Sequence, residues 1–243
     1  MHRSLISIAD FFSTRPLVSA TAVASIPLLA IIIPAYRGFL ALGPGGLPYN
    51  FIGFTIQAVG LLFAHRDTTS ADTVRTAPAN HQNARTRYLP DLTPRKTPRP
   101  LIPGYSAPHR QASQQGDETL VATLNGYLAS LAESNAGLVI KGSGLELSTY
   151  PALWTVEEET PAHVLKTTGG EIAHVHPEGS AHMVLSLADA AEVLEKGWGE
   201  MHPLAGRVGR LPISYIMIYA PRNDTEVLVW KMMADAAVAY VSA

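Results

Sequence analysis

Apolar and polar residues follow the periods of helices and short strands through the second half of the chain. A spacing of three to four residues relates Leu120, Leu124, Tyr127, Leu128 and Leu131. This spacing predicts an amphipathic helix that begins near Asp117 and packs one face on a core. Turns that contain Gly and Pro then separate short apolar runs, which predict strands at Leu138–Ile140, Leu145–Ser148, His163–Thr167, Glu171–His176 and His182–Leu187.

The pattern then predicts two more helices and a further strand. Ser186, followed by Asp189, indicates the start of a helix over Ala188–Lys196 that ends at Gly197. Ile213–Tyr219 is typical of a strand, and Asn223 can cap a last helix that runs to about Tyr240. Helices that flank a mostly antiparallel sheet predict an α+β fold.

The first part of the chain carries two apolar runs. Leu17–Ile33 is uncharged and has about the minimum length for a membrane-crossing helix, so we expect an N-terminal hydrophobic anchor helix. The run does not fit a secretory signal, because no suitable cleavage site follows it. Pro27 argues against a buried helix of a soluble domain. The second run, Tyr49–Ala64, contains Asn, Gln and Gly and indicates an interfacial or buried helix.

Residues 66–116 are rich in Pro, Thr and Arg and show little apolar periodicity. This composition predicts an extended, solvated connector, and its arginines could also contact anionic lipid headgroups. Because basic flanks stay on the cytoplasmic side of membranes, we expect the folded part in the cytosol, anchored to an endoplasmic reticulum-type membrane. The predicted domains are therefore an anchor region (1–65), a connector (66–116) and a folded domain (117–243).

Composition narrows the class of protein. Hydrophobic residues make up 47% and charged residues 16% of the chain, which excludes a disordered protein. Residues 1–110 carry 11 Lys and Arg against 4 Asp and Glu, but the basic residues are dispersed and lack interleaved aromatics, so no nucleic-acid partner is expected. The absence of cysteine excludes disulfides, thiolate metal sites and a cysteine nucleophile.

Histidines concentrate in one short stretch. His174 and His176 point to the same face of a strand, about 6.6 Å apart along it, and His182 can return on the facing strand. His202 could supply a fourth imidazole. Imidazoles at this spacing can bind Zn, Cu or Fe, in partial similarity to the first motif of cupin barrels, or can exchange protons with an acidic enol or phenol. They could also be structural.

Two segments typical of loops, GWG at 197–199 and APRN at 220–223, lie at the ends of predicted elements. Trp198 could line the pocket of an aromatic ligand, or fill the core, and Arg222 could pair with an enolate or carboxylate, or be a surface charge. The chain contains no Walker A loop, no strand-bound GxGxxG, no GxSxG elbow and no HExxH. A nucleotide site is therefore not expected.

These motifs resemble those of the fungal luciferases and their non-luminous relatives. The resemblance rests on EIAHVH at 171–176, EVLEKGWG at 192–199 with HPLAG at 202–206, and YAPRN at 219–223, with weaker similarity at residues 39–44 and 89–100. It implies a membrane-anchored oxygenase that acts on a hydroxylated styrylpyrone, 3-hydroxyhispidin. In that family oxygen adds to form an endoperoxide, carbon dioxide leaves and light is emitted, with molecular oxygen as co-substrate and no flavin, haem or nicotinamide.

The resemblance suggests roles for residues without assigning them. We expect His174, His176, His182 and His202 to be catalytic, Trp198, Tyr219 and Arg222 to bind substrate, and no metal or other cofactor to take part. The turn between His176 and His182 is shorter than in the luminous enzymes, which leaves the substrate and light emission open. Two alternatives remain: a metal-dependent enzyme that uses the histidine cluster, and a non-catalytic module that binds aromatic metabolites at a membrane.

Overall fold

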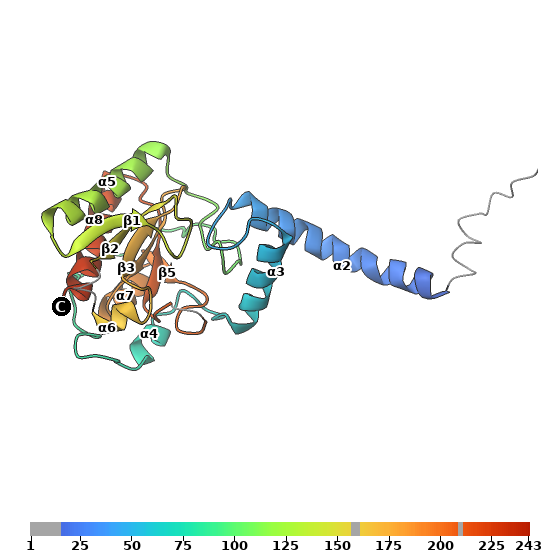
Figure 1. Ribbon diagram of the computed structural model, residues 1–243, viewed down its shortest axis with the longest axis horizontal. Helices are drawn as coiled ribbons and strands as arrows, with labels where there is room; N and C mark the ends of the chain where they lie inside the picture. The colour runs from blue at the N-terminus through green and yellow to red at the C-terminus, as the bar shows by residue number, and fades with distance from the viewer. Residues whose placement is uncertain (1–15, 157–160, 209–210) are drawn as a thin grey trace, which may run out of the picture. The chain divides into compact units, whose positions relative to one another are not determined.

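The computed structural model describes residues 16–156, 161–208 and 211–243 (Figure 1). The chain divides into two compact units, residues 1–41 and residues 42–243. In the first unit the described element is helix α2 (Pro16–Ala41), which covers the apolar run predicted as an anchor. Within the described ranges, no helix combines the length and the hydropathy needed to cross a bilayer. A membrane-spanning anchor is therefore not supported.

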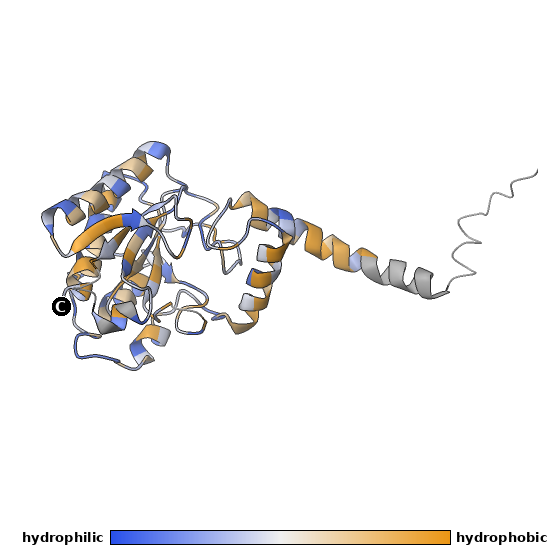
Figure 2. Cartoon of the chain, in the orientation of Figure 1, coloured by the Kyte–Doolittle hydropathy of each residue, from blue (hydrophilic) through white to orange (hydrophobic). Residues whose placement is uncertain are grey.

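The second unit begins with short helices. Asn50 caps helix α3 (Phe51–Gly60) because its side chain accepts hydrogen bonds from the amides of Ile52 and Gly53. The 3-10 helix η1 (Leu61–Phe63) continues α3, and α4 (Asp72–Thr76) follows. Figure 2 shows the apolar character of α3, several of whose large side chains are exposed.

The described residues form one six-stranded sheet in the order β1-β2-β3-β4-β6-β5, and neighbouring strands are antiparallel. The strands are β1 (Leu138–Gly142), β2 (Pro151–Thr155), β3 (Glu171–Val175), β4 (Ala181–Val184), β5 (Gly199–Met201) and β6 (Tyr215–Ile218). Helices α5 (Glu118–Ser134), α6 (Ala162–Leu165), α7 (Leu187–Glu195) and α8 (Asp224–Val241) complete the unit. The predicted α+β class is confirmed.

Two long helices cover the sheet. Helix α5 contacts β1, β2 and β3, and α8 contacts β3 and β4. Leu124 and Leu128 of α5 and Trp230 and Met233 of α8 are fully buried in the core. Leu124 and Leu128 belong to the apolar positions that the helical spacing predicts for α5. The predicted caps are also confirmed, because the side chains of Asp117, Ser186 and Asn223 accept hydrogen bonds from the first turns of α5, α7 and α8.

Some predicted strands are wrong. Residues 145–148 form a turn, because the Ser143 hydroxyl accepts the amides of Leu145 and Glu146. Residues His163–Thr167 overlap the short helix α6 (Ala162–Leu165) and the turn that follows it, and they form no strand. The prediction also missed β2, which begins at Pro151, and β5, which has only three residues. Short elements carry too few apolar positions to show a clear period.

Residues 66–116 contain little regular structure, as the composition predicts, but they are not a solvated linker. Six of their apolar residues belong to the buried core: Ala71, Val74, Ala77, Ala84, Leu89 and Leu92. The Asp189 carboxylate accepts the backbone amides of Tyr88 and Leu89, which ties this segment to helix α7. The prediction of a solvated connector is wrong in this respect, and the boundaries at residues 65 and 116 stay predictions.

Candidate functional site

The hairpin β3–β4 places three histidines together. His174 and His182 are directly opposed in the antiparallel register, and His176 follows the last residue of β3. The turn between the strands includes Gly179 at φ +88°, a conformation that glycine adopts without strain. Ring centroids lie 5.3 Å apart for His174 and His182 and 4.7 Å apart for His176 and His182. The predicted convergence of these three imidazoles is therefore present.

Two further histidines extend the cluster. The His202 ring lies 5.4 Å from His182, and the His109 ring lies 5.0 Å from His202. His109 Nδ1 is 3.2 Å from His182 Nε2, and its Nε2 is 2.9 Å from a carboxylate oxygen of Glu200. The sequence analysis missed His109 because it lies in the predicted connector.

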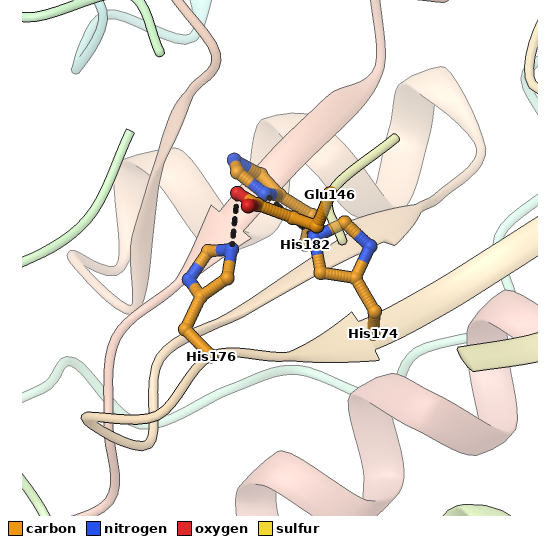
Figure 3. A group of neighbouring side chains, drawn as sticks. All are labelled: Glu146, His174, His176 and His182. Atoms are coloured by element: carbon orange, nitrogen blue, oxygen red, sulfur yellow. Dashed lines mark hydrogen bonds and ion pairs between the residues drawn. The ribbon is translucent and has the colours of Figure 1, made fainter. Parts of the chain in front are cut away.

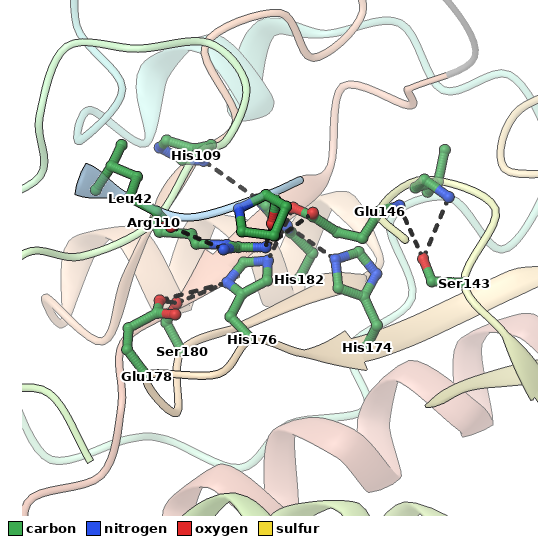
Figure 4. Close-up of polar contacts among 12 residues, drawn as sticks. Leu42, His109, Arg110, Ser143, Glu146, His174, His176, Glu178, Ser180 and His182 are labelled. Carbon is green, nitrogen blue, oxygen red and sulfur yellow. Dashed lines mark hydrogen bonds and ion pairs between the residues drawn. The ribbon is translucent and has the colours of Figure 1, made fainter. Parts of the chain in front are cut away.

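A carboxylate and a guanidinium complete the cluster. The turn at Ser143 directs Glu146 toward the histidines, and Figure 3 shows its carboxylate beside His176 and His182. Glu146 Oε2 lies 3.0 Å from an Arg110 nitrogen, while its Oε1 lies 3.5 Å from His176 Nε2. Arg110 also donates to the carbonyl oxygen of Leu42 (Figure 4). A single Glu and a single Arg outside any motif gave no signal that sequence reasoning could use.

The cluster lies against a cavity of about 750 Å³. The cavity volume is within the range of small-molecule sites in proteins, roughly 300–1,000 Å³. Its polar side is formed by Glu146, His109, His174, His182, His202 and Tyr215. Its apolar side is formed by α3, η1 and nearby loops, with Leu47, Ile56, Val59, Phe63, Leu145, Leu204, Val208 and Leu211. Such a cavity fits a small, largely apolar molecule with one polar end.

Burial fixes the charge state of several groups. It lowers the pKa values of His182 and His202 well below the ordinary value, and neighbouring histidines lower them further. Burial likewise raises the pKa of Tyr215, whose ring stacks on His182 with centroids 4.6 Å apart. These side chains are therefore neutral near pH 7, and the imidazoles retain lone pairs for protons or metal ions.

Two groups of side chains have the composition of metal ligands. Nitrogen and carboxylate oxygen atoms lie within 4.8 Å of one another in the group Glu146, His174, His176 and His182, and in the group His109, His182 and His202. His182 belongs to both groups. The arrangement can either bind a cation or exchange protons with a ligand.

The three predicted substrate-binding residues lie outside this cavity lining. Trp198 is buried and donates its indole N–H to the Thr93 carbonyl, and Arg222 pairs with Glu226. The Tyr219 hydroxyl donates to Glu200, which in turn contacts His109. The structure thus brings Tyr219 into the cluster's hydrogen-bond network and leaves Trp198 and Arg222 apart from it. Their roles in binding stay predictions.

Known proteins with similar sequences place the chain in a family. A family model described as the Luciferase domain matches residues 169–237, which include β3, β4 and most of α8. A luciferase of Armillaria mellea is 33% identical over 236 residues, which cover 92% of this chain and 86% of the relative. A luciferase of Neonothopanus nambi is 29% identical over 242 residues, with 94% and 86% covered.

The chain belongs to the fungal luciferase family. Family membership implies an enzyme with a small-molecule substrate, in agreement with the cavity, and it confirms the resemblance found in the sequence. The matched domain contains His174, His176, His182 and His202, whereas His109 and Glu146 lie before it in the chain. No solved structure matches the chain significantly.

Proposed function

We propose that the protein oxygenates and decarboxylates a hydroxylated styrylpyrone of the 3-hydroxyhispidin type, with emission of light. One observation carries this proposal: a cluster of buried imidazoles forms the polar side of a largely apolar cavity. A planar molecule of two linked rings can place its apolar part against α3 and its acidic enol against the imidazoles. The luciferases among the relatives support the reaction class.

The proposed reaction needs no external reductant. Loss of the enol proton makes the pyrone ring electron-rich enough to reduce oxygen itself. Both atoms of O₂ then add to the ring as an endoperoxide. Its O–O bond breaks, the lactone carbonyl carbon leaves as carbon dioxide with the two lactone oxygens, and both atoms of O₂ stay in the keto acid. The remaining keto acid is formed in an excited state. The protein's tasks are therefore to ionise the enol, to position the ring and to exclude water.

The described contacts suggest how these tasks divide. His174 and His182 line the cavity, so we propose that they receive the enol end. The His176 ring lies outside the lining, with its centroid 5.1 Å from that of His174, and acts through its neighbours. We predict that Arg207, which lines the same cavity, balances the negative charge of the bound ligand. Arg222, the cation expected from the sequence, is held in an ion pair with Glu226 instead.

The membrane partner also stays a proposal. Support comes from α3 and η1, where Phe51, Ile52, Ile56, Leu62 and Phe63 are exposed. Of these, Ile56 and Phe63 also line the cavity, so a sparingly soluble pyrone could enter from a lipid surface. Flotation of the full chain with anionic vesicles tests this: binding that Ile52→Asp and Leu62→Asp abolish is expected, and equal flotation of the variant would contradict it.

The reaction is tested by mixing the full chain with 3-hydroxyhispidin in air while photons, oxygen uptake and products are recorded together. We expect oxygen uptake equal to carbon dioxide release, with light. His81→Ala, which changes a histidine absent from the cavity lining, is the matched control for the cluster variants. Tight binding of the pyrone without oxygen uptake would show a non-catalytic binding module instead, and oxygen uptake without photons would show a non-luminous relative.

A further inference from the structure

The hydrogen bonds around the cluster determine which ring nitrogens carry hydrogen. His174 Nδ1 lies 2.7 Å from Glu171 Oε1, and the Glu171 carboxylate also accepts the Ser143 hydroxyl and the Gly144 amide. Glu171 is therefore an acceptor, and His174 donates to it through Nδ1–H. The Nε2 atom of His174 then has a free lone pair.

His176 is held in the same tautomer. Its Nδ1 lies 2.8 Å from the Ser180 oxygen, and the Ser180 hydroxyl itself donates to the carboxylate of Glu178. The Ser180 oxygen must therefore accept from His176 Nδ1–H. The Nε2 atom of His176 is fully buried and has no hydrogen-bond partner among the described residues. This atom faces Glu146 Oε1 at 3.5 Å, an acceptor that cannot donate to it when ionised.

His182 is oriented by a longer chain. Glu200 accepts the Tyr219 hydroxyl, so His109 donates to Glu200 through Nε2–H and presents the lone pair of its Nδ1. His182 in turn donates through Nε2–H to that lone pair at 3.2 Å. The free lone pair of His182 is therefore on Nδ1, which lies 3.4 Å from His174 Nε2, another lone pair.

Four electron-rich atoms thus meet at one buried point: His174 Nε2, His176 Nε2, His182 Nδ1 and a carboxylate oxygen of Glu146. One ligand atom from each of the four residues lies within 4.8 Å of the others, and of the named atoms His182 Nδ1 is 3.4 Å from His174 Nε2 and His176 Nε2 is 3.5 Å from Glu146 Oε1. Figure 3 shows these side chains converging from β3, β4 and the turn after β1. Acceptors that face acceptors in a buried site repel each other, and a cation between them removes the repulsion. Each histidine also has the outer hydrogen-bond partner typical of metal ligands.

We propose that Glu146, His174, His176 and His182 bind one divalent first-row transition-metal ion. Three imidazoles and one carboxylate suit Zn²⁺, Fe²⁺, Mn²⁺ or Co²⁺. Arg110, which pairs with the other Glu146 oxygen, holds the carboxylate in place. The second group is a weaker candidate, because both nitrogens of His109 are used by His182 and Glu200 and the Nδ1 of His202 accepts the Leu204 amide.

The role of the ion in the reaction rests on the proposed function, whereas the binding of the ion does not. Because a lone pair that binds a metal cannot also accept a proton, the three imidazoles would act as ligands. The ion would then lower the pKa of an enol oxygen that approaches it from the cavity, which His174 and His182 line. The ligands of the ion are the four side chains alone, so metal binding can be tested without the pyrone.

The test is metal content, measured on untagged full-length protein. The chain is stripped with a chelator, loaded with Co²⁺ or Zn²⁺ and desalted, and metal is counted per chain while Co²⁺ absorption is recorded. We expect one ion per chain and the ligand-field bands of Co²⁺ bound to nitrogen. His176→Ala and Glu146→Gln should abolish both signals. Glu171→Gln, which changes the hydrogen-bond partner of His174 and leaves the four proposed ligands in place, should lower affinity by about 10- to 100-fold.

His202→Ala is the matched control, because it removes a cavity histidine of the second group and none of the proposed ligands. It should retain one ion per chain. Loss of the ion in this variant, or a folded wild-type chain that binds no Co²⁺ or Zn²⁺, would overturn the inference. Oxygen uptake by metal-free protein would reject the ion's role and leave the proposed function intact. One bound ion per chain without turnover of the pyrone would reject the proposed function and leave the metal site intact.

Discussion

Two buried polar clusters of this protein differ in how their charges and lone pairs are used. In the cluster beside α8, the Arg95 guanidinium pairs with Glu226 at 3.1 Å and lies over the Trp198 and Tyr219 rings, and Arg222 pairs with the second Glu226 oxygen. In the histidine cluster, several acceptors face one another beside a cavity. The first cluster pairs both of its guanidinium groups with Glu226 and leaves one buried donor nitrogen of Arg95 without a partner, whereas the second leaves acceptors that require a proton, a ligand or a cation.

Whether buried polar groups are paired with one another distinguishes residues that stabilise the fold from residues that can react with a ligand. Residue type alone does not make this distinction. Both clusters contain residues that the sequence predicts as site residues, and both include Arg–carboxylate pairs. The Arg95 cluster also lines a hollow, but its unpartnered atom is a donor nitrogen of Arg95. Of these two clusters of described residues, the histidine cluster is the one that presents an unpartnered acceptor, His176 Nε2, next to its cavity. Substitutions in the histidine cluster should therefore affect turnover, and substitutions in the Arg95 cluster should affect stability.

Removal of an imidazole from the histidine cluster should abolish most of the activity. For His174→Ala or His176→Ala we expect turnover of 3-hydroxyhispidin to fall by about 1,000-fold, since each imidazole helps to ionise the enol, directly or as a ligand of the proposed ion, and a positioned group of this kind contributes roughly 10²–10⁴. Initial rates of oxygen uptake measure the loss, and thermal unfolding verifies the fold. Turnover within threefold of wild type in both variants would show that the site is elsewhere.

Disruption of the other cluster should reduce stability instead. Arg95→Met leaves Glu226 without its buried partner, and removal of one member of a buried pair costs about 3–5 kcal/mol. Urea unfolding measures this change in the free energy of unfolding. Turnover per folded molecule should stay within twofold of wild type. A hundredfold loss of turnover in fully folded protein would place Arg95 in the chemistry and contradict the distinction.

The contact between residues 66–116 and α7 should also stabilise the fold. Asp189→Ala removes the acceptor for the amides of Tyr88 and Leu89, and an unsatisfied buried donor costs about 1–3 kcal/mol. The backbone amide of Asp189 donates to the Ser186 hydroxyl that caps α7, and Asp189→Ala keeps this bond. Ser186→Ala, which removes the cap bond and leaves the carboxylate in place, therefore provides a comparison. Unchanged unfolding free energy in Asp189→Ala would mean that the segment is only loosely attached.

A histidine pair outside the lining of the cavity should make stability depend on pH. The rings of His81 and His163 stack with centroids 3.8 Å apart near Tyr240, and burial lowers the pKa of His163 to about 4. In the unfolded chain, the imidazole of His163 binds a proton with the ordinary histidine pKa of about 6.5. Unfolding therefore takes up a proton between these values, and stability is lost as the pH falls from about 6.5 toward 4.

His163→Gln should weaken this dependence. The melting temperature of the variant should fall less between pH 7 and pH 5 than that of the wild type. Identical pH dependence in both proteins would show that the pair does not titrate on unfolding as proposed.

The smallest effect is expected for Arg222→Ala. Arg222 is partly exposed, and Arg95 continues to pair with Glu226 in its absence. We expect a loss of stability below about 1 kcal/mol and turnover within twofold. A tenfold increase in KM with unchanged kcat would restore Arg222 as a substrate-binding residue, the role that the sequence suggested.

The sequence predicted the parts of the fold that have clear periods or caps. The helices at Asp117, Ser186 and Asn223 and the hairpin that carries His174 and His182 follow from local patterns. His109 and Glu146 could not be found in this way, because each reaches the cluster through tertiary contacts from an irregular segment. The burial of residues 66–116 was missed for a similar reason, since isolated apolar residues between prolines show no period.

One measurement addresses the central claim, that the histidine cluster ionises a bound enol. Under argon, so that no oxygen reacts, 3-hydroxyhispidin is titrated with the full chain and its absorption spectrum is recorded. The account predicts the spectrum of the enolate at a pH where the free compound is protonated, and no such change with folded His174→Ala/His176→Ala protein. A ligand that binds the wild type and keeps its neutral spectrum would contradict the account.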